Sequence, residues 1–528
     1  MEPVVPNDGK VRNSEPAVVA LTTLCLIAIA AMLRVGDLGP TSLWVDDAWV
    51  AYVDRAAWSD IPAIGLTGIG YLFGLKAWLA ILGFSEVAAQ LPAFILGVAA
   101  PPALYLVLRR RLGGVAAATL ALVLATNDVH ITYSYHVKQY TFDALWSVAC
   151  LWFCLRIASD RASVRLHVGF ASVAIVAAVI SFTTIVETVA AFTAATIAIG
   201  WREIRNRRNG AANPLVRGGA ISIAAMTVAG LAMVGFQRVV IEPNVTPGIR
   251  AYWSDQFVDR TTIRTSFLSL ADRFTEVTAV TFSLDPDSTL TKIATVLLFG
   301  FIGLGVRRFD PPAVFCAVAV GVAAMLSFLG LAPLGGGRTD LHLLVPLIAG
   351  GALGIHSVVG RLDRPLRPLR SAGWAVAGAA SLVFVAINPP SPRPYPDNVA
   401  SDFVAIIDAQ RQPTDAILLH RSAFVYGLYT DRPSEPISDN YHYSPAFEDD
   451  PLMFRLQWGL GDPAPLRDRL ALVGEQSNVM WILSSPMRTP EGLDPVVTIL
   501  DEFGWTMTDR HVGQEAVLDR WEQLTDNG

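Results

Sequence analysis

A series of long apolar segments limits what this chain can fold into more than any other sequence feature. A helix needs about 20 mostly apolar residues to cross a bilayer, and about eleven segments come close to that length. The chain is 52% hydrophobic and only 16% charged, whereas soluble domains carry roughly 25% charge. We therefore predict membrane spans at residues 16–34, 88–108, 113–127, 141–158, 166–183, 185–201, 217–236, 291–306, 311–331, 341–359 and 371–388.

The predicted fold class is an α-helical polytopic membrane protein with about eleven transmembrane helices and a small C-terminal extracytoplasmic α/β domain. Residues 1–15 form a polar tail, and residues 16–388 form the transmembrane domain. The first apolar run is longer than a signal-peptide core, so we expect it to be retained. Two loops, 35–87 and 237–290, are too long for simple turns and are expected to include interfacial helices.

The basic residues predict the orientation in the membrane. If the N-terminus is cytoplasmic, every predicted inside connection is short and basic, as the positive-inside rule requires. An odd number of spans then places the C-terminal domain outside a multi-pass cell-membrane protein. The inside cations are Lys10, Arg12, Arg109, Arg110, Arg111, Arg161, Arg165, Arg202, Arg205, Arg207, Arg208, Arg307, Arg308, Arg361, Arg364, Arg367 and Arg370.

A proline-rich linker at residues 389–397 separates the last span from a polar segment, 398–528. We expect helices at 398–410, 465–473 and 495–503, and strands at 416–420, 479–484, 506–511 and 515–520. This pattern of helices and strands predicts a small α/β domain.

Net charge and cysteine placement exclude several functions. The formal net charge is −6, and no basic run is interleaved with aromatics, so no nucleic-acid partner is expected. All four cysteines lie in apolar runs, and Cys150 and Cys154 are spaced to pack in a helix bundle. No CxxC or HExxH motif is present, so no metal ligand set is assigned.

Two adjacent carboxylates, Asp46 and Asp47, follow the first span between Trp44 and Trp49. They could cap a helix whose tryptophans anchor it at the membrane interface. Alternatively, one of them could act as a base at the membrane surface.

A second polar cluster precedes the span at 141–158. Within residues 127–140 it gathers two histidines, three tyrosines and a lysine, and His136, Lys138 and Tyr140 stand closest to the span. Lys138 opposes the positive-inside trend. It could snorkel to the headgroups, or it could bind an anion beside the bilayer.

Further candidates lie in three other connections. Gly335 to Gly337 precede Arg338 and Asp340, a pattern that suits either phosphate oxygens or an ion-paired loop. Tyr252 and Trp253 could stack on a sugar ring or belong to an interfacial helix. Glu187 lies between two spans, where a short turn at the outer surface explains an acidic residue as well as a functional role does.

These motifs occur in an order that resembles the GT-C superfamily of membrane glycosyltransferases. The likeness is to the branch that contains protein O-mannosyltransferases and aminoarabinose transferases (glycosyltransferase family 39). It rests on residues 44–48 after the first span, on residues 133–140 before the fourth, and on residues 336–338 before Pro346. Where the family usually has Asp-Glu, this chain has Asp46-Asp47, and Lys138 replaces a frequent arginine.

The resemblance implies an inverting transfer of a sugar from a polyprenyl-phosphate donor to an acceptor hydroxyl on the outer face. Asp46 would be the general base, and Asp47 would position substrate or base. Lys138, Arg338, Tyr140 and His136 would bind the donor phosphate. Tyr252, Trp253 and Asp340 would contact substrate.

The sequence leaves the sugar and the acceptor open, the latter being a lipid, a polysaccharide or a protein. It indicates no cofactor and leaves the use of a divalent metal open; membrane lipids are the other expected partners. Two other functions are compatible with the sequence: a transporter or flippase for a lipid-linked glycan precursor, and a non-catalytic GT-C relative. The polar clusters stand at the outer ends of spans rather than near the midplane, which favours the transferase.

Overall fold

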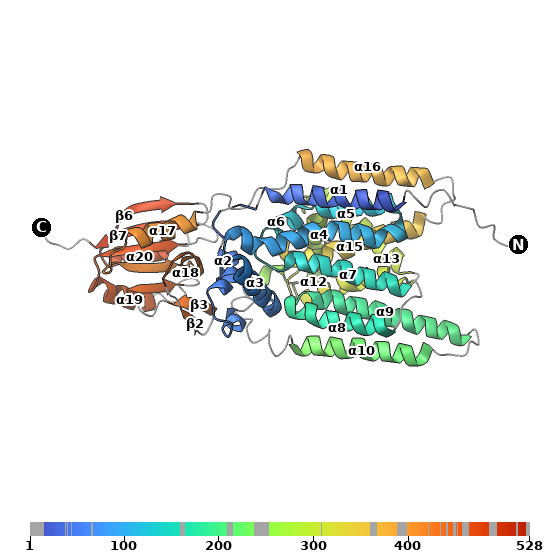
Figure 1. Ribbon diagram of the computed structural model, residues 1–528, viewed down its shortest axis with the longest axis horizontal. Coiled ribbons are helices and arrows are strands. Elements are labelled where there is room, and N and C mark those ends of the chain that lie inside the picture. The colour runs from blue at the N-terminus through green and yellow to red at the C-terminus, as the bar shows by residue number, and fades with distance from the viewer. Residues whose placement is uncertain are drawn as a thin grey trace. The chain divides into compact units, whose positions relative to one another are not determined.

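The computed structural model describes residues 15–36, 38–39, 41–43, 45–64, 67–158, 164–208, 215–236, 253–307, 309–359, 367–387, 399–420, 422–432, 435–439, 442–446, 450, 452–456, 464–484, 494–513 and 516–523. The chain forms two compact units (Figure 1). The bundle unit consists of residues 1–38 and 91–391, and the sheet unit of residues 39–90 and 392–528.

Long helices make up the bundle unit, and seven of those described are long and apolar enough to cross a membrane: α1, α4, α7, α9, α13, α14 and α15. Each of the eleven predicted spans coincides with a helix, but several helices are shorter, so the number of spans stays a prediction. The helices are α1 (Glu15–Val35), α4 (Glu86–Leu112), α5 (Gly114–Ala125), α6 (Asp128–Thr132), α7 (Tyr140–Ala158), α8 (Val164–Ile180), α9 (Thr184–Arg208), α10 (Leu215–Phe236), α12 (Ile263–Phe282), α13 (Thr289–Val306), α14 (Pro311–Phe328), α15 (Leu341–Val359) and α16 (Arg367–Ile387).

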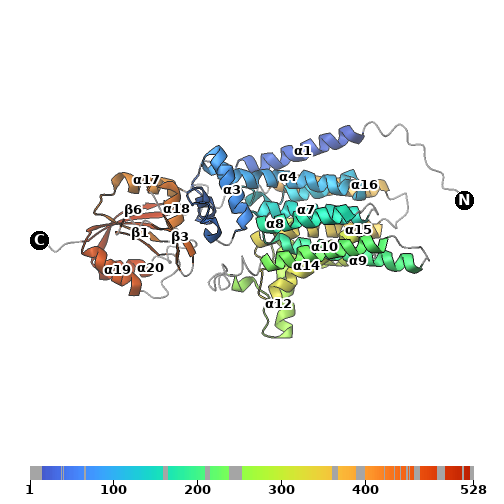
Figure 2. The same cartoon turned by 60° about the horizontal axis from the view of Figure 1, so that its bottom comes forward.

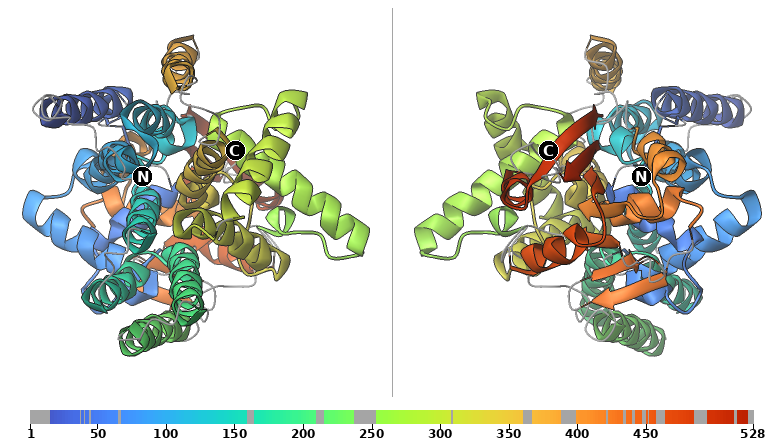
Figure 3. Two further views of the ribbon diagram at one scale, coloured as in Figure 1. Left: turned by 90° about the vertical axis from the view of Figure 1, so that its right-hand side faces the viewer. Right: turned by 90° about the vertical axis from the view of Figure 1, so that its left-hand side faces the viewer.

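Helices α7, α14 and α15 form the centre of this bundle. In α15, 78% of the apolar window is buried, against 61% in α7 and in α14 and 11% in α1. Helix α15 packs against α7, α13 and α14, and the left view of Figure 3 shows the bundle helices nearly end-on. Helices that are apolar on all sides and surrounded by other helices are what a membrane bundle requires. The chain is therefore a multi-pass membrane protein.

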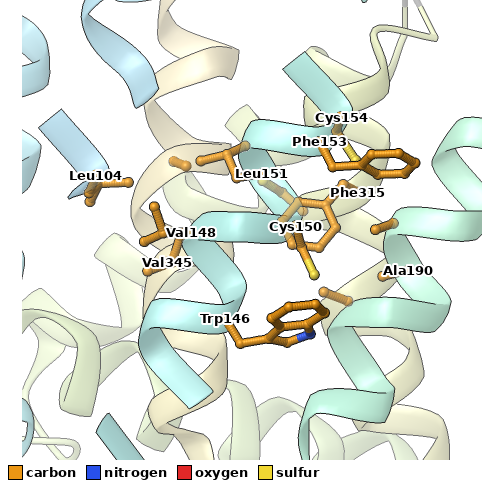
Figure 4. Close-up of a cluster of buried hydrophobic side chains, with 14 of the residues drawn as sticks. Leu104, Trp146, Val148, Cys150, Leu151, Phe153, Cys154, Ala190, Phe315 and Val345 are labelled. Carbon is orange, nitrogen blue, oxygen red and sulfur yellow. The ribbon is translucent and has the colours of Figure 1, made fainter. Parts of the chain in front are cut away.

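Small and aromatic side chains fill the bundle core. Cys150 and Cys154 are fully buried, which confirms that they pack in a bundle. Figure 4 shows them on α7 with Trp146, near Phe315 of α14. Close packing also depends on Gly97 of α4, because a Cβ built there would stand 2.2 Å from the Ser134 hydroxyl oxygen.

The sheet unit contains one five-stranded sheet in the order β4-β1-β5-β7-β6. Strands β4, β1 and β5 are parallel, and β7 and β6 join them antiparallel. Figure 2 shows helices on both sides of the sheet, α17 and α18 on one and α19 and α20 on the other. The strands are β1 (Ala416–His420), β4 (Met453–Leu456), β5 (Val479–Ser484), β6 (Trp505–Val512) and β7 (Val517–Gln523), with a separate hairpin β2 (Glu435–Asp439) and β3 (His442–Ala446).

The polar C-terminal segment folds much as its pattern predicts. Strands β1 and β5 have the predicted bounds, and α17 (Ala400–Gln410), α19 (Ala464–Gly474) and α20 (Asp494–Glu502) lie within two residues of the predicted helices. Helix α18 (Ala423–Tyr429), strand β4 and the hairpin were not predicted from the sequence. These elements are short, and α18 is too short for a helical period to be recognised.

The first loop between predicted spans also contains helices. They are α2 (Val45–Ala51), the 3₁₀ turns η1 (Tyr52–Asp54) and η2 (Ile61–Ile64), and α3 (Ile69–Leu82). The predicted domain boundaries assign this loop to the transmembrane domain, whereas the structure groups residues 39–90 with the C-terminal sheet. Packing between α2 and α18 is the physical reason for this grouping.

One buried carboxyl in the sheet unit makes stability depend on pH. Burial raises the pKa of Asp519 from 3.8 to about 6, against the opposing effect of Arg510, whose Nε lies 3.3 Å from Asp519 Oδ1. Within the part of the chain that the structure describes, this oxygen has no hydrogen-bond partner. The unfolded carboxyl ionises first, so the wild type should lose stability as the pH rises from 3.8 to about 6. We expect Asp519→Asn to lack this loss and to have a higher Tm at pH 8. If the difference in Tm between Asp519→Asn and the wild type were the same at pH 4 and at pH 8, the assignment would be wrong.

Candidate functional site

The adjacent carboxylates occupy the first turn of α2. Asp46 is half-buried, and Asp47 is 4% exposed. Carboxylates in the first turn of a helix interact favourably with its unsatisfied N–H groups. Burial and the nearby Asp47 raise the pKa of Tyr71 on α3, so its hydroxyl stays protonated. Asp46 is therefore the more accessible of the two acids, while Asp47 belongs to the interior of the unit.

A lysine that the sequence analysis did not single out shapes the segment after α2. The Lys76 ammonium donates to the carbonyls of Val53 at 2.9 Å and Ala56 at 2.7 Å, and it lies 5.3 Å from the centre of the Trp58 ring. These bonds satisfy carbonyl groups at the end of η1 and join α3 to the chain that follows α2.

In the bundle unit, Arg34 organises the loop that carries Lys138. Its guanidinium is fully buried and donates to the Ser134 hydroxyl at 2.9 Å, to the Ala125 carbonyl at 3.1 Å and to His130 Nδ1 at 2.7 Å. Burial and this neighbouring charge hold the pKa of His130 well below its usual value, so the ring can accept. The sequence analysis treated Arg34 only as the end of the first span. Its function depends on residues about 100 positions away.

Aromatic rings form the rest of this loop. The Tyr133 ring lies 5.1 Å from the rings of both His136 and Tyr140, and Tyr135 lies 5.2 Å from His136. His136 is 5% exposed, whereas Lys138 and Tyr140 are half-buried. The predicted phosphate ligands His136 and Tyr140 therefore belong to one aromatic cluster in the loop that also carries Lys138.

Asp340 folds the glycine segment. Its carboxylate accepts backbone N–H groups from Gly335 at 3.0 Å and Gly337 at 3.1 Å. Both glycines have positive φ, +92° and +67°, which L side chains rarely adopt. Asp340 is 1% exposed, and its two backbone hydrogen bonds stabilise this turn. Its contact with substrate stays a prediction.

The turn presents Arg338 beside an aromatic ring. The guanidinium carbon of Arg338 lies 4.7 Å from the centre of the Trp253 ring, a cation–π contact. A backbone hydrogen bond of 3.0 Å from Leu334 to Gln256 holds the two segments together. Trp253 and Arg338, two separately predicted site residues that are 85 positions apart in the sequence, are thus neighbours. Tyr252 and Trp44 lie outside the described residues.

The loop with Lys138 and the turn with Arg338 precede two helices that pack together. Pro346 lacks an N–H, so the carbonyl of His342, four residues earlier, loses its helical partner. The hydroxyl of Ser147 on α7 donates to this carbonyl at 2.8 Å. The N-terminal parts of α7 and α15 are therefore joined, and both cation-bearing segments stand at this end of the helix pair.

Three ionisable side chains lie in the first turns of bundle helices: Asp143 of α7, Glu187 of α9 and His342 of α15. Glu187 is 0% exposed, with its Oε1 3.8 Å from His342 Nε2. Neither oxygen of Glu187 has a hydrogen-bond partner among the described residues. Glu187 is therefore a buried residue in the first turn of α9 and not part of an exposed surface turn, which was one of the two readings that the sequence left open. Among the described residues, no group of three His, Cys, Asp or Glu side chains is placed to hold a metal ion.

Removal of Arg34 should disturb the loop that carries Lys138. Arg34→Met leaves the polar groups around it without a donor, at about 1–3 kcal/mol for each unsatisfied group. We expect a lower thermal stability in detergent. Arg111 is a matched control, because its guanidinium is 45% exposed and pairs with Asp310 at the surface, where ion pairs contribute little. Equal stability of Arg34→Met and Arg111→Met would contradict this role.

Comparisons with known proteins agree with this architecture. A family model described as dolichyl-phosphate-mannose-protein mannosyltransferase matches residues 68–229. The structure of ArnT from Cupriavidus metallidurans bound to undecaprenyl phosphate aligns with a TM-score of 0.50 at 13% identity, over 96% of this chain and 98% of that one.

The oligosaccharyltransferase of Archaeoglobus fulgidus aligns with a TM-score of 0.48 at 12% identity, over 88% of this chain and 68% of that one. No curated protein matches the sequence. At these identities the structural likeness concerns the fold, which is that of ArnT.

Proposed function

We propose that this chain, as a member of the GT-C superfamily of membrane glycosyltransferases, transfers a sugar from a polyprenyl-phosphate donor to an acceptor hydroxyl. The undecaprenyl phosphate named with the ArnT structure supports a donor of this class. The observation that carries the proposal is the placement of Lys138 and Arg338 at the joined ends of α7 and α15. Two cations at one end of two packed membrane helices suit the phosphate of a lipid.

The reaction is a single inverting displacement at the sugar. Asp46 takes the proton of the acceptor hydroxyl as its oxygen attacks C1, and the bond between C1 and the phosphate oxygen breaks. The leaving lipid phosphate carries away the bonding electron pair as negative charge. Lys138 and Arg338 stabilise that charge, and His136 and Tyr140 line the phosphate site. Trp253, with Tyr252 and Asp340, is assigned to substrate contact.

Each role follows from residue chemistry. Asp46 is the more exposed of the two acids, as a base that meets an acceptor must be, and the buried Asp47 positions the helix around it. The cation–π contact with Trp253 limits the directions in which the Arg338 guanidinium can point. A preorganised cation stabilises developing charge at a lower reorganisation cost than a mobile one.

The direct test is transfer in membranes from a panel of polyprenyl-phosphate sugars. Each radiolabelled donor is incubated with membranes that contain the wild type or the variant Asp46→Asn. We expect at least one donor to label an acceptor in a wild-type-dependent manner. No labelling from any polyprenyl-phosphate sugar, with the protein present and folded, would overturn the proposed donor class.

We also propose that the N-terminus is cytoplasmic and the sheet unit extracytoplasmic in the cell membrane. The short basic connections support this orientation, since cytoplasmic loops carry an excess of lysine and arginine. A fusion at Gly528 to a reporter that is active only outside the cytoplasm should be active. Activity of a cytoplasm-specific reporter at the same position would reverse the orientation.

A flippase for a lipid-linked glycan precursor is the second candidate. Buried Glu187 and Asp143 favour it, because ionisable groups within membrane segments often line transport pathways. The two functions differ in chemistry. A flippase moves the labelled lipid across vesicles without cleaving it, whereas the transferase releases the polyprenyl phosphate.

A further inference from the structure

Helix α2, which carries Asp46, packs against α18 of the polar C-terminal segment. The Trp49 ring stacks on Phe424 with centroids 5.5 Å apart and planes at 21°. The Tyr52 ring meets the same Phe424 edge-on at 5.8 Å. One aromatic side chain of α18 therefore contacts the middle of α2 and the turn that follows it. Offset aromatic contacts of this kind contribute beyond their buried area and fix relative orientation.

Hydrogen bonds hold the chain on either side of α2. Before the helix, the Leu43 N–H donates to the Tyr429 hydroxyl at 2.6 Å. After the helix, the Arg55 guanidinium donates to the Leu428 carbonyl at 3.3 Å. The Tyr429 hydroxyl also hydrogen-bonds the carboxyl of Glu86, and burial raises its pKa, so it remains protonated. The two ends of the carboxylate helix are thus both attached to the C-terminal end of α18.

A second pair of bonds extends this attachment to α17. The Ser401 N–H donates to the Ser42 hydroxyl oxygen at 2.9 Å, and the two serine hydroxyls lie 2.7 Å apart. Five residues between 42 and 55 therefore contact α17 or α18.

Helix α2 has only seven residues, and isolated helices shorter than about 12 residues are marginal in water. Its orientation must therefore come from packing. Part of this packing comes from the nearby loop, where the Trp49 indole donates to the Ile64 carbonyl at 2.9 Å. The aromatic part comes from Phe424, almost 400 residues away in the sequence.

We propose that Phe424 and Tyr429 are positioning residues for Asp46, and that α17 and α18 act as the scaffold of α2. This inference rests on the proposed function, in which Asp46 is the base. Neither residue touches the reacting atoms. Displacement of a catalytic group by about 1 Å can lower a rate by on the order of 10²-fold, so loosening α2 should mainly reduce kcat.

The experiment compares five variants of the full chain in membranes with a donor that the wild type uses. Phe424→Ala removes the stacked ring, and Phe424→Trp keeps an aromatic surface for Trp49. Tyr429→Phe removes the acceptor for the Leu43 N–H and keeps the ring. Leu470→Ala is the matched control, because Leu470 is fully buried on the far face of the sheet with no assigned contact to α2. Asp46→Asn tests the base itself.

We expect Phe424→Ala to lower kcat about 10-fold or more, and Tyr429→Phe to lower it less, with the KM for the donor within about twofold. Phe424→Trp should restore most of the rate. Hydrogen exchange should accelerate in residues 41–52 of Phe424→Ala and Tyr429→Phe. Leu470→Ala should lower the thermal stability with kcat retained below its Tm.

Wild-type kcat in both Phe424→Ala and Tyr429→Phe, alongside an inactive Asp46→Asn, would overturn the positioning role and leave the proposed function intact. Full activity of Asp46→Asn would instead remove the proposed base. If Phe424→Ala does not fold, Tyr429→Phe decides the matter, because it deletes only one oxygen atom. An equal loss of kcat in Leu470→Ala would reduce the effect to general stability and would also overturn the proposal.

Discussion

Asp46→Asn is expected to lower kcat by on the order of 10²–10⁴-fold, the usual contribution of a general base. The substitution keeps the size of the side chain and removes its ability to take the acceptor proton. Because Asp46 is half-buried and lies in the first turn of α2, the amide should fit without displacing the helix. Donor binding should persist, and the measurement is the initial rate of sugar transfer at saturating donor.

Two variants control this prediction. Asp54→Asn changes an acid of η1, after α2, and should transfer at the wild-type rate, since no role in the reaction is assigned to its carboxylate. Asp47→Asn changes the neighbouring buried acid and should reduce both the rate and the thermal stability. A similar small loss in Asp46→Asn and Asp54→Asn would show that Asp46 is not the base.

Arg338→Ala is expected to lower kcat by about 10²–10³-fold, as the loss of a preorganised charge-stabilising group does. The reason is that the leaving phosphate gains negative charge as the bond to C1 breaks. The neutral variant leaves that charge to Lys138 alone. The measurement is kcat/KM for the donor, together with the affinity for the free polyprenyl phosphate, which should also fall.

Two further variants separate charge from orientation. Arg338→Lys keeps the positive charge but loses the planar fork, so its rate should lie between those of the wild type and Arg338→Ala. Trp253→Leu keeps the arginine and removes the ring 4.7 Å from its guanidinium carbon, so the rate should fall while the phosphate affinity changes less. Arg338→Ala would contradict the assignment if it lowered only the thermal stability.

The membrane class and the helix positions could be predicted from the sequence, because a helix that crosses a bilayer needs a long run of apolar residues, which the sequence shows directly. Strands β1 and β5 could be predicted equally well, since their apolar residues form short runs between turns. Helix α18 was not, because seven residues cannot display a helical period. Its role became visible only from Phe424 and Tyr429 in contact with α2.

Some of the candidate residues could likewise be recognised from the sequence, and others could not. Asp46, Lys138 and Arg338 were recognisable because charged groups next to apolar runs are costly and therefore informative. Arg34 was not recognisable, because it stands at the end of a span like any interfacial cation. For Glu187 the sequence left an outer-surface turn and a functional role open, since position between two spans cannot tell an exposed residue from a buried one.

The sequence by itself determined that this protein lies in a membrane, the order of its helices, and which charged residues stand next to them. Those properties follow from local composition and periodicity, which each segment carries alone. Only the tertiary structure decided which of these groups contact one another: Arg34 with His130, Arg338 with Trp253, and helix α2 with helix α18. Such pairings join residues dozens to hundreds of positions apart, and packing rather than local preference selects them.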